Sequence, residues 1–540
     1  MADNPFAHAT AWSLLDAVAT RHGQREAIVF GDERLTFAAV RDRARAFAAG
    51  LSALGLGHGD ALAIWLPNRP LWFIAQYAAA SLGIVVVALN PRYRAHELSY
   101  ILGQSNAVAL LLTDRLGPID YFDTLETLLP ELADAVPGEL TSARFPKLRH
   151  VIVDADDVYP GCHRALDLFV AGAVRPARTE GDDTFMLLYT SGTTSFPKGA
   201  MITHANCVPH GWNCGETFRL TAADRVLHAL PAAGTWGGVN IPLTAWSHGA
   251  CLVLMDVFDP LRALQLIERE RCTVLNAVDS MLIPLLDHPD LGRRDLSSLR
   301  TGGVAAVGGG RHGLLEDVLE RLVPLAFHPY GMTEVNAMSL VHDLDEPASE
   351  RLVPGVWPLP GLEARIADPE TGAPSDIDVE GELQFRGPLV TRGYYDKPDE
   401  TRAAFTNDGW FKSGDLGVQD DAGRVIFRGR LKETLRISHH MVAPGEIEAF
   451  LLAHPAIGQA FVVGVPDPKT NEAPVAYVIC KPGARVTEDD VRAWCHGKIA
   501  SFKIPRRVRF VDDVPRTPSA HGDKVQRVKL REMALKEFAS

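Results

Sequence analysis

A short run near the middle of the chain combines residue types that suit the binding of a polyphosphate. Residues 187–199 read Leu-Leu-Tyr-Thr-Ser-Gly-Thr-Thr-Ser-Phe-Pro-Lys-Gly. Hydroxyl groups and backbone N–H groups can donate hydrogen bonds to phosphate oxygens, and Lys198 adds positive charge. The spacing is not that of the P-loop, because no Gly-Lys-Ser/Thr follows a glycine at the required distance. The preceding apolar run, Phe185 to Leu188, predicts a buried strand that leads into the loop.

Four further motifs follow this run in a fixed order. They are Tyr330-Gly-Met-Thr-Glu334, Asp408-Gly-Trp-Phe-Lys-Ser-Gly-Asp415-Leu-Gly417, Gly429-Arg-Leu-Lys432-Glu433 and Pro515-Arg-Thr-Pro-Ser-Ala-His-Gly-Asp-Lys524. A plain surface turn rich in Ser, Thr and Gly would not be expected to come with such companions. Together with Asn90-Pro-Arg-Tyr93, the motifs resemble the adenylate-forming superfamily of acyl- and aryl-CoA ligases, amino-acid adenylation domains and beetle luciferases. The resemblance covers essentially the whole chain.

This resemblance implies a first reaction in which a carboxylate attacks the α-phosphorus of ATP and pyrophosphate leaves. The protein must neutralise the developing phosphate charge and hold both reactants in line. The residues implied to cradle the β- and γ-phosphates are Thr190, Ser191, Gly192, Thr193, Thr194 and Lys198. Thr333 would bond the α-phosphate, and Glu334 would bind Mg²⁺, for which one carboxylate plus phosphate oxygens is a common ligand set.

The nucleoside half of ATP would be held by the later motifs. Tyr330 is implied to lie against the adenine. Asp415 is implied to accept hydrogen bonds from both ribose hydroxyls, because an ionised carboxylate has two acceptor oxygens. Arg430 would reach the ribose or the phosphates. As alternatives, Asp415 could be an ordinary turn residue and Arg430 a surface charge.

Lys524 matches the catalytic lysine of the family, which lies near the C-terminus. A charge on a long, mobile stem suits a residue that reaches the active site only when a small domain closes. The family places a glycine directly before this lysine, whereas this chain reads Ser519-Ala-His-Gly-Asp-Lys524, with extra residues. The register to Leu530-Arg531 is kept, which favours Lys524. The alternatives are that Lys524 is an ordinary exposed lysine, or that Lys503 has the catalytic role.

The second reaction is where the sequence departs most from the family. In the CoA ligases the small domain rotates about a hinge, here Lys432, and presents a glycine that lines the pantetheine passage, where a side chain would crowd it. In this chain residues 438–441 are Ser-His-His-Met, so His439 stands at the glycine position. Histidine titrates near neutrality, so His439 or His440 could act as a general base, although loop histidines are also often merely solvated.

Three possibilities for the function of the chain therefore stay open. Transfer to CoA as a thioester is favoured. Capture by another nucleophile would make the chain an amide ligase, or a nitrite-activating ATP-dependent diazotase that acts on an aryl amine. A non-catalytic nucleotide-binding protein is the third possibility, and the retention of Lys198, Glu334 and Asp415 argues against it.

The acid pocket is implied to lie around residues 230–240, 276–280 and 301–304. Gly234 replaces a side chain that often gates the pocket in the family, and Trp236 could compensate. Asp279 stands where the family often has proline, and its carboxylate could face solvent or pair with an amine or hydroxyl of the substrate. The remaining pocket candidates are Asn240, Gly302, Gly303 and His328. The glycines leave room for a flat ring or a chain, so aryl and aliphatic acids both fit, with a planar aromatic acid favoured.

One motif is a decoy. Gly308-Gly-Gly-Arg-His-Gly313 fits the pattern G-x-G-x-x-G before a helical run, Leu314 to Leu322. No clear βαβ unit with a following ribose-binding acid accompanies it, so binding of a dinucleotide cofactor is not predicted.

The elements that position these residues predict an α/β fold. Strand–helix alternation over residues 12–115 and 186–344 indicates layered α/β subdomains with largely parallel sheets, and residues 114–181 are interpreted as a variable connector. Short strands with turns over 361–427 indicate a β-rich subdomain. After Lys432 a small α+β unit follows, with a helix at 444–453 and a strand at 459–463. The expected domains are an adenylation domain, 1–431, and a mobile domain that carries the catalytic lysine, 432–540.

Bulk properties restrict the function classes. The 540 residues are 46% hydrophobic and carry a net charge of −13, so a general nucleic-acid surface is not expected and an anionic nucleotide needs a local positive site. No apolar run has the length of a membrane span, and no signal peptide is recognised. Seven scattered cysteines without a C-x-x-C pair predict reduced thiols in a cytoplasmic protein. The expected partners are an acid, ATP, Mg²⁺ and CoA, and the expected assembly is a monomer or homodimer.

Overall fold

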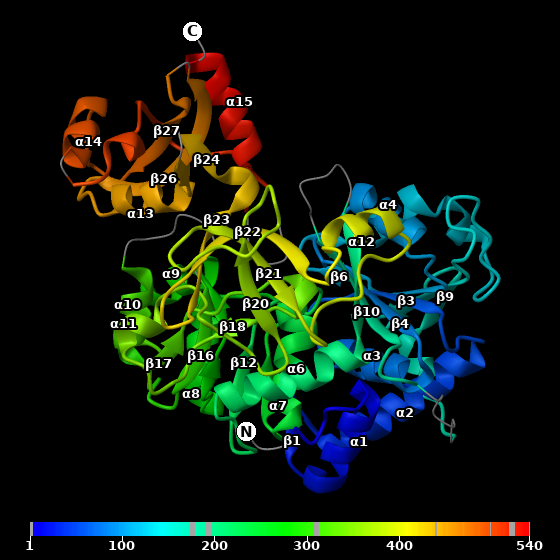
Figure 1. The fold of residues 1–540 in the computed structure, drawn as a ribbon. Helices are drawn as coiled ribbons and strands as arrows, with labels where there is room; N and C mark the ends of the chain where they lie inside the picture. Colours follow the sequence, from blue (N-terminus) through cyan, green and yellow to red (C-terminus); the bar gives the residue numbers. More distant parts are fainter. Residues whose placement is uncertain are drawn as a thin grey trace.

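The computed structural model describes residues 4–172, 179–190, 197–305, 313–437, 440–467, 469–496, 498–517 and 524–538. Two large sheets and a smaller antiparallel sheet form the part of the chain up to Arg430. A separate lobe, orange to red at the top of Figure 1, holds the remainder. The predicted α/β class, with a large N-terminal and a small C-terminal domain, is confirmed.

The seven-stranded sheet has the order β11-β10-β4-β3-β5-β8-β9. Its strands are β3 (Ala61–Trp65), β4 (Val85–Ala88), β5 (Ala109–Thr113), β8 (His150–Asp154), β9 (Cys162–Arg164), β10 (Thr184–Thr190) and β11 (Lys198–Thr203). Neighbouring strands are parallel except β10 and β11. Leu62 and Ile64 belong to one core, whereas Ala63 and Trp65 belong to another, because strand side chains alternate between faces. Burial of both faces explains the unbroken apolar runs.

The eight-stranded sheet has the order β15-β16-β14-β12-β13-β1-β2, with β17 paired to β16. Its strands are β1 (Glu26–Phe30), β2 (Glu33–Thr36), β12 (Arg225–His228), β13 (Cys251–Leu254), β14 (Val274–Leu275), β15 (Ala277–Val278), β16 (Thr301–Ala305) and β17 (Leu325–Phe327). Only the β1–β2 hairpin is antiparallel. Segments that follow β14 and β17 at their carboxyl ends contain the predicted site residues, which is the usual place for ligands in such sheets.

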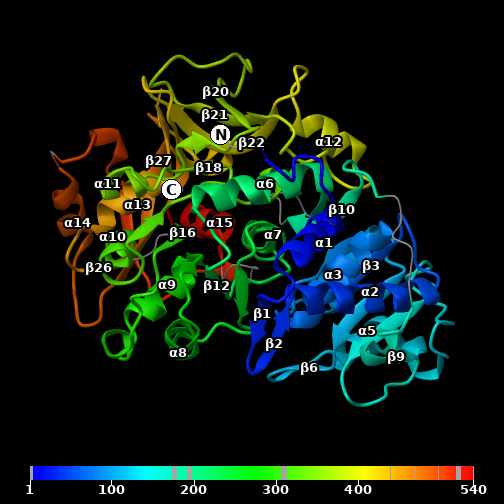
Figure 2. The same cartoon turned by 90° about the horizontal axis from the view of Figure 1, so that it is seen from below.

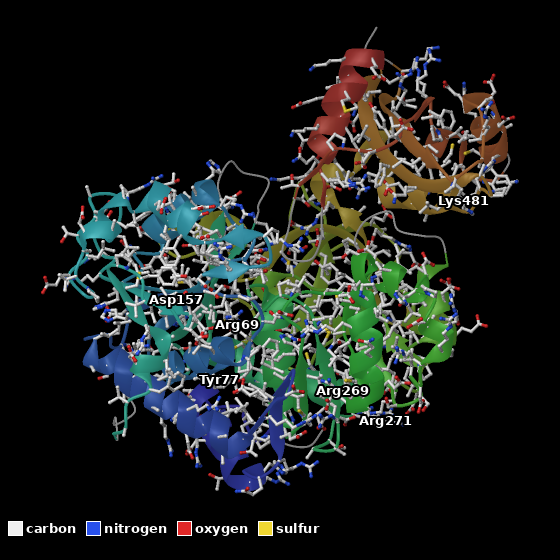
Figure 3. The ribbon with its side chains drawn as sticks, turned by 180° about the vertical axis from the view of Figure 1, so that it is seen from behind. Arg69, Tyr77, Asp157, Arg269, Arg271 and Lys481 are labelled. Atoms are coloured by element: carbon white, nitrogen blue, oxygen red, sulfur yellow. The ribbon has the colours of Figure 1, made fainter. Side chains whose placement is uncertain are left out.

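Helices cover both sheets. Those that share a core with both are α1 (Ala11–His22), α2 (Phe37–Ala53), α3 (Pro70–Leu82), α6 (His204–Thr217) and α7 (Ile241–Ser247). Others are α4 (Ala95–Gln104), α5 (Phe122–Leu128), α8 (Pro260–Glu270), α9 (Asp279–Leu286) and α10 (Leu314–Arg321). Figure 2 shows α8 and α9 on one side of the molecule and α2, α3 and α5 on the other. Tyr77, labelled in Figure 3, is 1% exposed, and its ring centroid lies 4.9 Å from that of Trp246.

The start of α6 is fixed chemically. Thr203 ends β11 and caps the helix: its hydroxyl accepts the backbone N–H of Asn206 at 3.3 Å. Asn206 returns the bond, because its Oδ1 accepts the Thr203 N–H at 3.0 Å. Such reciprocal capping satisfies two backbone donors that a helix start would otherwise leave unpaired. The strand that begins at Lys198 therefore passes directly into a firmly started helix.

The interpretation of residues 114–181 as a mere connector is wrong in part. This segment contributes β8 and β9 to the seven-stranded sheet, with Leu110 opposite Val151. The run His150-Val-Ile-Val153 is short and buried, so it has no alternation that could distinguish it from a loop. Smaller elements in the N-terminal domain are β6 (Arg115–Leu116), β7 (Ile119–Asp120), η1 (Pro130–Asp134), η2 (Ala165–Leu168), η4 (Leu291–Arg293), β18 (Leu340–Val341), α11 (Ala348–Arg351) and β19 (Trp357–Pro358).

The predicted β-rich subdomain is an antiparallel sheet of four strands. They are β20 (Glu363–Ala367), β21 (Gly381–Arg386), β22 (Phe411–Gln419) and β23 (Val425–Arg430), with α12 (Pro398–Ala404) inserted before β22. Tyr330 and Val335 pack into the core of this sheet. This packing places the motif Asp408–Gly417, most of which lies on β22, next to the motif Tyr330–Glu334.

The C-terminal lobe has its own sheet and two cores. Its elements are η6 (Leu431–Glu433), β24 (Leu435–Ile437), β25 (His440–Val442), α13 (Pro444–Leu452), β26 (Ile457–Asp467), β27 (Asn471–Cys480), α14 (Glu488–Cys495), η7 (Ser501–Lys503), β28 (Arg507–Phe510), β29 (Arg516–Thr517), β30 (Lys524–Val525) and α15 (Arg527–Phe538). The helix at 444–453 and the strand at 459–463 are confirmed.

A half-buried arginine, Arg527, links the two ends of this lobe. One guanidinium nitrogen of Arg527 donates to Glu448 Oε2 at 2.9 Å, and another donates to the Val462 carbonyl at 3.0 Å. Its Nε lies 3.0 Å from Glu433 Oε2 in η6. Glu448 is only 3% exposed, so its charge needs this partner. The start of α15 is thus joined to the segment that enters the lobe.

All seven cysteines are free thiols, and all except Cys480 are buried. Burial raises the pKa of the Cys214 thiol to about 12. Among the described residues, no helix has the length and apolar character that crossing a membrane requires.

Candidate functional site

The ends of the phosphate loop are held together by the β10–β11 hairpin. Thr190 and Lys198 are direct partners in the antiparallel ladder. Ser191, Gly192, Thr193 and Thr194 lie outside the described residues. The Lys198 Nζ atom lies over the ring of Tyr394, 5.0 Å from its centroid.

A second cluster joins three predicted residues. The Tyr330 hydroxyl donates to Asp415 Oδ2 at 2.6 Å, and an Arg430 guanidinium nitrogen lies 2.9 Å from Asp415 Oδ1. Asp415 and Arg430 are register partners on β22 and β23. Asp415 is only 2% exposed, and burial raises its pKa to about 6 although Arg430 and Tyr330 oppose that shift. This carboxyl group is therefore mostly ionised at neutral pH but becomes protonated at mildly acidic pH.

Glu334 is buried close to both groups. It lies in η5 (Thr333–Val335), is 5% exposed, and its Oε1 accepts the Tyr394 hydroxyl at 2.9 Å. Burial raises the pKa of the Glu334 carboxyl, while the Tyr394 hydroxyl, Arg430 and Lys198 lower it. The neighbouring Thr333 hydroxyl accepts a hydrogen bond from the Thr235 hydroxyl at 2.8 Å. Thr333 and Glu334 thus lie between the Lys198 hairpin and the Asp415 sheet.

The donor set of this region suits Mg²⁺. A carboxylate is a hard oxygen ligand, and Mg²⁺ commonly takes one or two carboxylates and completes its shell with phosphate oxygens and water. The described residues contain no group of three or more His, Cys, Asp or Glu side chains arranged to hold a metal. Glu334 therefore fits an ion shared with a bound triphosphate better than an ion held by the protein alone.

Two contacts in this site were missed in the sequence. Tyr394 reaches Glu334 from the segment between β21 and α12, and Thr235 reaches Thr333 from the segment after β12. Neither belongs to one of the five ordered motifs. The run Arg392-Gly-Tyr-Tyr is too short and too ordinary to signal a role. Only the fold brings these residues to the second motif.

The predicted pocket residues Trp236 and Asn240 lie on one unusual turn. Residues Trp236–Asn240 form a π-helix (η3) that continues into α7. Such turns are rare and frequently occur at functional sites. The glycines inside it are required by close packing, because a Cβ on Gly238 would lie 1.9 Å from the Ala232 carbonyl oxygen. Trp236 and Asn240 are both buried, at 8% and 1% exposure.

Asn240 points into a polar cluster on α6. Its Nδ2 lies 3.3 Å from Cys214 Sγ and 3.4 Å from His210 Nδ1. Burial lowers the pKa of His210 to about 4, so this histidine is neutral at physiological pH. The side chains of α6 around Asn240 are therefore polar but uncharged.

Gly302 and Gly303 differ in what they face. A Cβ on Gly302 would lie 1.8 Å from the Leu275 carbonyl oxygen on β14. A Cβ on Gly303 would lie 3.1 Å from Trp236 Cζ2 and 3.3 Å from Asn276 Oδ1. The Gly303 N–H also donates to Asn276 Oδ1 at 2.9 Å. Gly302 is thus explained by the packing of β16 on β14, whereas Gly303 faces the Trp236 side chain.

This difference makes the two glycines a matched pair. We expect Gly302→Ala to lower the free energy of unfolding by about 3 kcal/mol or more, because backbone atoms cannot relax from such a clash. Gly303→Ala should fold nearly normally and change the KM for the acid instead. Thermal unfolding and acid titrations on both variants test this. Equal destabilisation by the two alanines would contradict the assignment.

The remaining predicted pocket residues, Asp279 and His328, make contacts with other parts of the chain. Asp279 begins α9 and is half-buried, and its Oδ1 accepts the Ser280 N–H at 2.8 Å. Burial lowers the pKa of His328 to about 4, and a hydrogen bond to the Leu352 backbone opposes that shift. The His328 ring thus packs on the segment after α11.

The predicted hinge, the histidines predicted for the second reaction and the two candidate lysines all belong to the C-terminal part of the chain. Lys432 lies in η6, directly after Arg430 and Leu431, and is exposed. His440 begins β25, and His439 lies outside the described residues. Lys524 lies in β30, opposite Thr517 of β29. Lys503, the alternative lysine, is ion-paired with Glu446 of α13.

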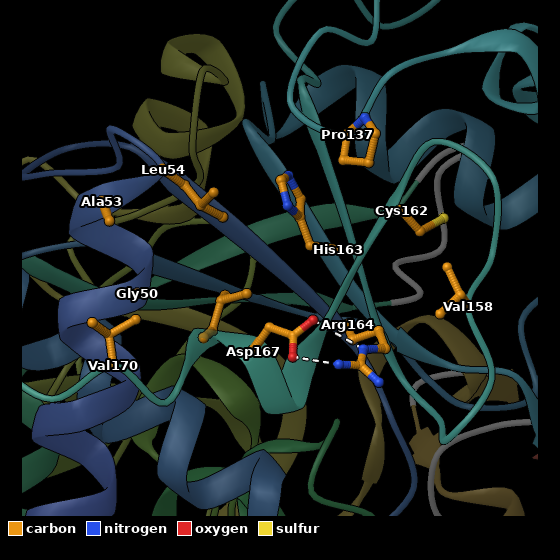
Figure 4. A pocket seen from close by; sticks show the side chains of 11 residues that line it. Gly50, Ala53, Leu54, Pro137, Val158, Cys162, His163, Arg164, Asp167 and Val170 are labelled. Atoms are coloured by element: carbon orange, nitrogen blue, oxygen red, sulfur yellow. Dashed lines mark hydrogen bonds and ion pairs between the residues drawn. The ribbon is translucent and has the colours of Figure 1, made fainter.

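A cavity elsewhere in the molecule contains none of the predicted residues. It measures about 580 Å³ and lies between the C-terminal end of α2, β9 and η2. Figure 4 shows Leu54, His163 and Val170 on its walls and the Arg164–Asp167 ion pair, 2.7 Å long, at its rim. The predicted site and this cavity are therefore distinct.

Comparisons with known proteins agree with this geometry. A family model described as AMP-binding enzyme matches residues 15–395, and one described as AMP-binding enzyme C-terminal domain matches residues 446–521. The "Putative acyl-CoA synthetase YngI" of Bacillus subtilis is 38% identical over 545 residues, covering 98% of each chain. The mitochondrial medium-chain acyl-CoA ligase ACSF2 of Mus musculus is 33% identical over 547 residues, covering 98% of this chain and 88% of that one.

A solved structure has the same architecture. The crystal structure of ATP-bound MatB from Rhodopseudomonas palustris aligns with a TM-score of 0.84 at 27% identity. The alignment covers 98% of this chain and 100% of the other.

Proposed function

We propose that this chain, which belongs to the AMP-binding enzyme family, uses the cluster around Glu334 and Asp415 as the active centre of an AMP-forming acid–CoA ligase. Such an enzyme activates a carboxylic acid with ATP to an acyl-adenylate and pyrophosphate, and then transfers the acyl group to CoA as a thioester. The carrying observation is that residues from three distant motifs lie near one another. Tyr394 contacts both Lys198 and Glu334, and Glu334 is close enough for its charge to act on the Asp415 carboxyl. Full-length similarity to acyl-CoA synthetases supports the CoA step over an amine or nitrite as acceptor.

The nucleoside would be held at the four-stranded sheet. Asp415 would accept the ribose hydroxyls, and its neighbour Arg430 would keep that carboxylate ionised while reaching the ribose or phosphates. Tyr330 is rigidly placed by its hydrogen bond to Asp415, so its ring offers a fixed face to the adenine. Lys198 and the loop from Thr190 would hold the β- and γ-phosphates, since the hairpin brings both ends of the loop to one place.

The chemistry would take place beside Thr333 and Glu334. Thr333 would donate to the α-phosphate, because its oxygen accepts the Thr235 hydroxyl and its own hydrogen is left to point elsewhere. Glu334 would hold Mg²⁺, which supplies neutralisation of phosphate charge in the transition state. Burial of Glu334 strengthens this interaction, since little water competes for its oxygens.

The small lobe would serve both reactions. We propose that Lys524 approaches the α-phosphate during adenylation and that rotation at Lys432 then brings the segment of His439 and His440 to the same site for thioester formation. The position of Lys432, in the short turn that separates the two sets of cores, supports a hinge there. Residues 1–431 and 432–540 would then move as two bodies.

The decisive experiment is ATP–pyrophosphate exchange over a panel of acids, followed by the mass of the product with CoA, an amine or nitrite present. We expect exchange with at least one acid and a thioester mass with CoA. The name of the ACSF2 relative makes medium-chain aliphatic acids the first class to test, and the Trp236–Gly303 contact makes aryl acids the second. AMP release that ignores CoA but responds to an amine or nitrite would contradict the thioester step.

A further inference from the structure

The segment Thr391–Tyr395 threads between two parts of the active centre. The Thr391 N–H donates to the Glu334 carbonyl at 2.7 Å, and the Met201 N–H of β11 donates to the Gly393 carbonyl at 2.9 Å. The Tyr395 N–H donates to the Gly199 carbonyl at 2.8 Å. The backbone of this segment is therefore bonded to the Lys198 strand on one side and to the Glu334 turn on the other.

The side chain of Tyr394 repeats this link. Its hydroxyl donates to Glu334 Oε1 at 2.9 Å, and its ring lies under the Lys198 ammonium at 5.0 Å from the centroid. Tyr394 is only 8% exposed, so neither contact is diluted by bulk water. One side chain thus touches the acidic and the basic residue that are proposed to handle the charge of the triphosphate.

Both contacts answer a physical need. A carboxylate buried as deeply as Glu334 needs a hydrogen-bond donor, and a donor on one oxygen also fixes the orientation of the group. A lysine stem has many rotamers, and an aromatic face attracts its ammonium without forming a strong ion pair that a phosphate would have to break.

We propose that Tyr394 is a positioning residue of the adenylation site: its hydroxyl orients the Glu334 side chain for Mg²⁺, and its ring keeps the Lys198 ammonium in place for the triphosphate. This inference rests on the roles proposed above for Glu334 and Lys198. Tyr394 itself needs no contact with the reacting atoms. The two functions separate by substitution, since phenylalanine keeps the ring and removes only the hydroxyl.

The test compares Tyr394→Phe and Tyr394→Leu in the full-length protein. For Tyr394→Phe we expect the Mg²⁺ concentration that gives half-maximal ATP–pyrophosphate exchange to rise roughly tenfold, the usual effect of losing a hydrogen bond to a charged group. Its KM for ATP at saturating Mg²⁺ should change little. Tyr394→Leu should raise both quantities, because it also removes the ring under Lys198.

Binding is read separately from turnover. The increase in melting temperature that Mg²⁺ adds to that of α,β-methylene-ATP should shrink in Tyr394→Phe. Tyr395→Phe is the matched control: it alters the next hydroxyl in the same segment, and its side chain packs on the second core of the seven-stranded sheet. We expect this control to keep the Mg²⁺ dependence of the unchanged protein.

Two results would overturn the inference in different ways. An unchanged Mg²⁺ dependence in Tyr394→Phe, while Glu334→Gln abolishes exchange, would show that Tyr394 only fills space. Normal exchange in Glu334→Gln would remove the proposed role of Glu334, and with it the part of the proposed function on which the inference stands.

Discussion

Replacing Asp415 with asparagine is expected to raise the stability of the ligand-free protein at pH 7.5 while weakening ATP binding by roughly tenfold or more. Burial raises the folded-state pKa of Asp415 from 3.8 to about 6. A carboxyl whose pKa is raised on folding favours the fold only in its protonated form. Its contribution to the free energy of unfolding is complete below the pKa of the unfolded state and is lost as pH rises through the pKa of the folded state.

The gain in stability should therefore depend on pH. Above pH 6 the folded protein carries a buried carboxylate that asparagine does not, and at about 1.4 kcal/mol per pKa unit the gain has an upper bound of about 3 kcal/mol. Below pH 4 the difference should vanish, because the carboxyl is then protonated in both states. Arg430 loses its ion pair, but its side chain is 52% exposed and water can solvate it.

ATP binding should move the other way. An asparagine amide has one acceptor oxygen in place of two, so it cannot accept both ribose hydroxyls as a carboxylate does. Thermal unfolding from pH 4 to 8 and ATP titration measure the two effects. Asp408→Asn is the control within the same motif, since Asp408 is largely exposed and its Oδ2 lies 3.1 Å from Arg365. A less stable Asp415→Asn protein at pH 7.5, or one with normal ATP affinity, would contradict the argument.

Lys524→Ala is expected to slow adenylation by roughly 10²- to 10³-fold, because a charge placed on the developing phosphate oxyanion is a large part of such catalysis. Formation of the thioester from a supplied acyl-adenylate and CoA should stay within about threefold of the unchanged rate, since the lobe would then be rotated and the lysine withdrawn. Single-turnover assays of the two half-reactions measure this contrast.

Both lysines lie in the C-terminal lobe, and the match to the family motif is what makes Lys524 our proposed catalytic residue. Lys524 lies in a short strand pair, and three residues later Arg527 ties its segment to Glu433 beside the hinge. Movement of the hinge would therefore carry Lys524 with it. Lys503 is instead ion-paired with Glu446 inside the lobe. Lys503→Ala is the control and should leave adenylation within about threefold. A larger loss in Lys503→Ala than in Lys524→Ala would reverse the assignment.

The sequence predicts those parts of the site whose residues lie in ordered motifs. Asp415 and Tyr330 are 85 residues apart, yet their motifs alone suggest one nucleotide site, and the structure joins them by a hydrogen bond. Tyr394 could not be predicted, because its role comes from a loop that crosses between two other elements. A tyrosine in such a loop has no fixed spacing from the other site residues by which a sequence pattern could identify it.

Local physics explains the other differences. The π-helical turn at Trp236–Asn240 depends on glycines packed against carbonyl groups, which is a property of tertiary contact and not of periodicity. Strand β8 is short and buried on both faces, so it lacks the alternation by which half-buried strands are recognised. In both cases the deciding interactions join residues outside the window that a sequence pattern covers.

The buried thiols have a consequence for an enzyme that makes electrophiles. An acyl-adenylate reacts with any thiolate within reach, and Cys214 Sγ lies beside Asn240, on the turn that carries Trp236. Because burial raises the pKa of Cys214 to about 12, this sulfur is a protonated, weak nucleophile at neutral pH. With the acid pocket at Trp236 as proposed, Cys214 would therefore not be acylated by the intermediate.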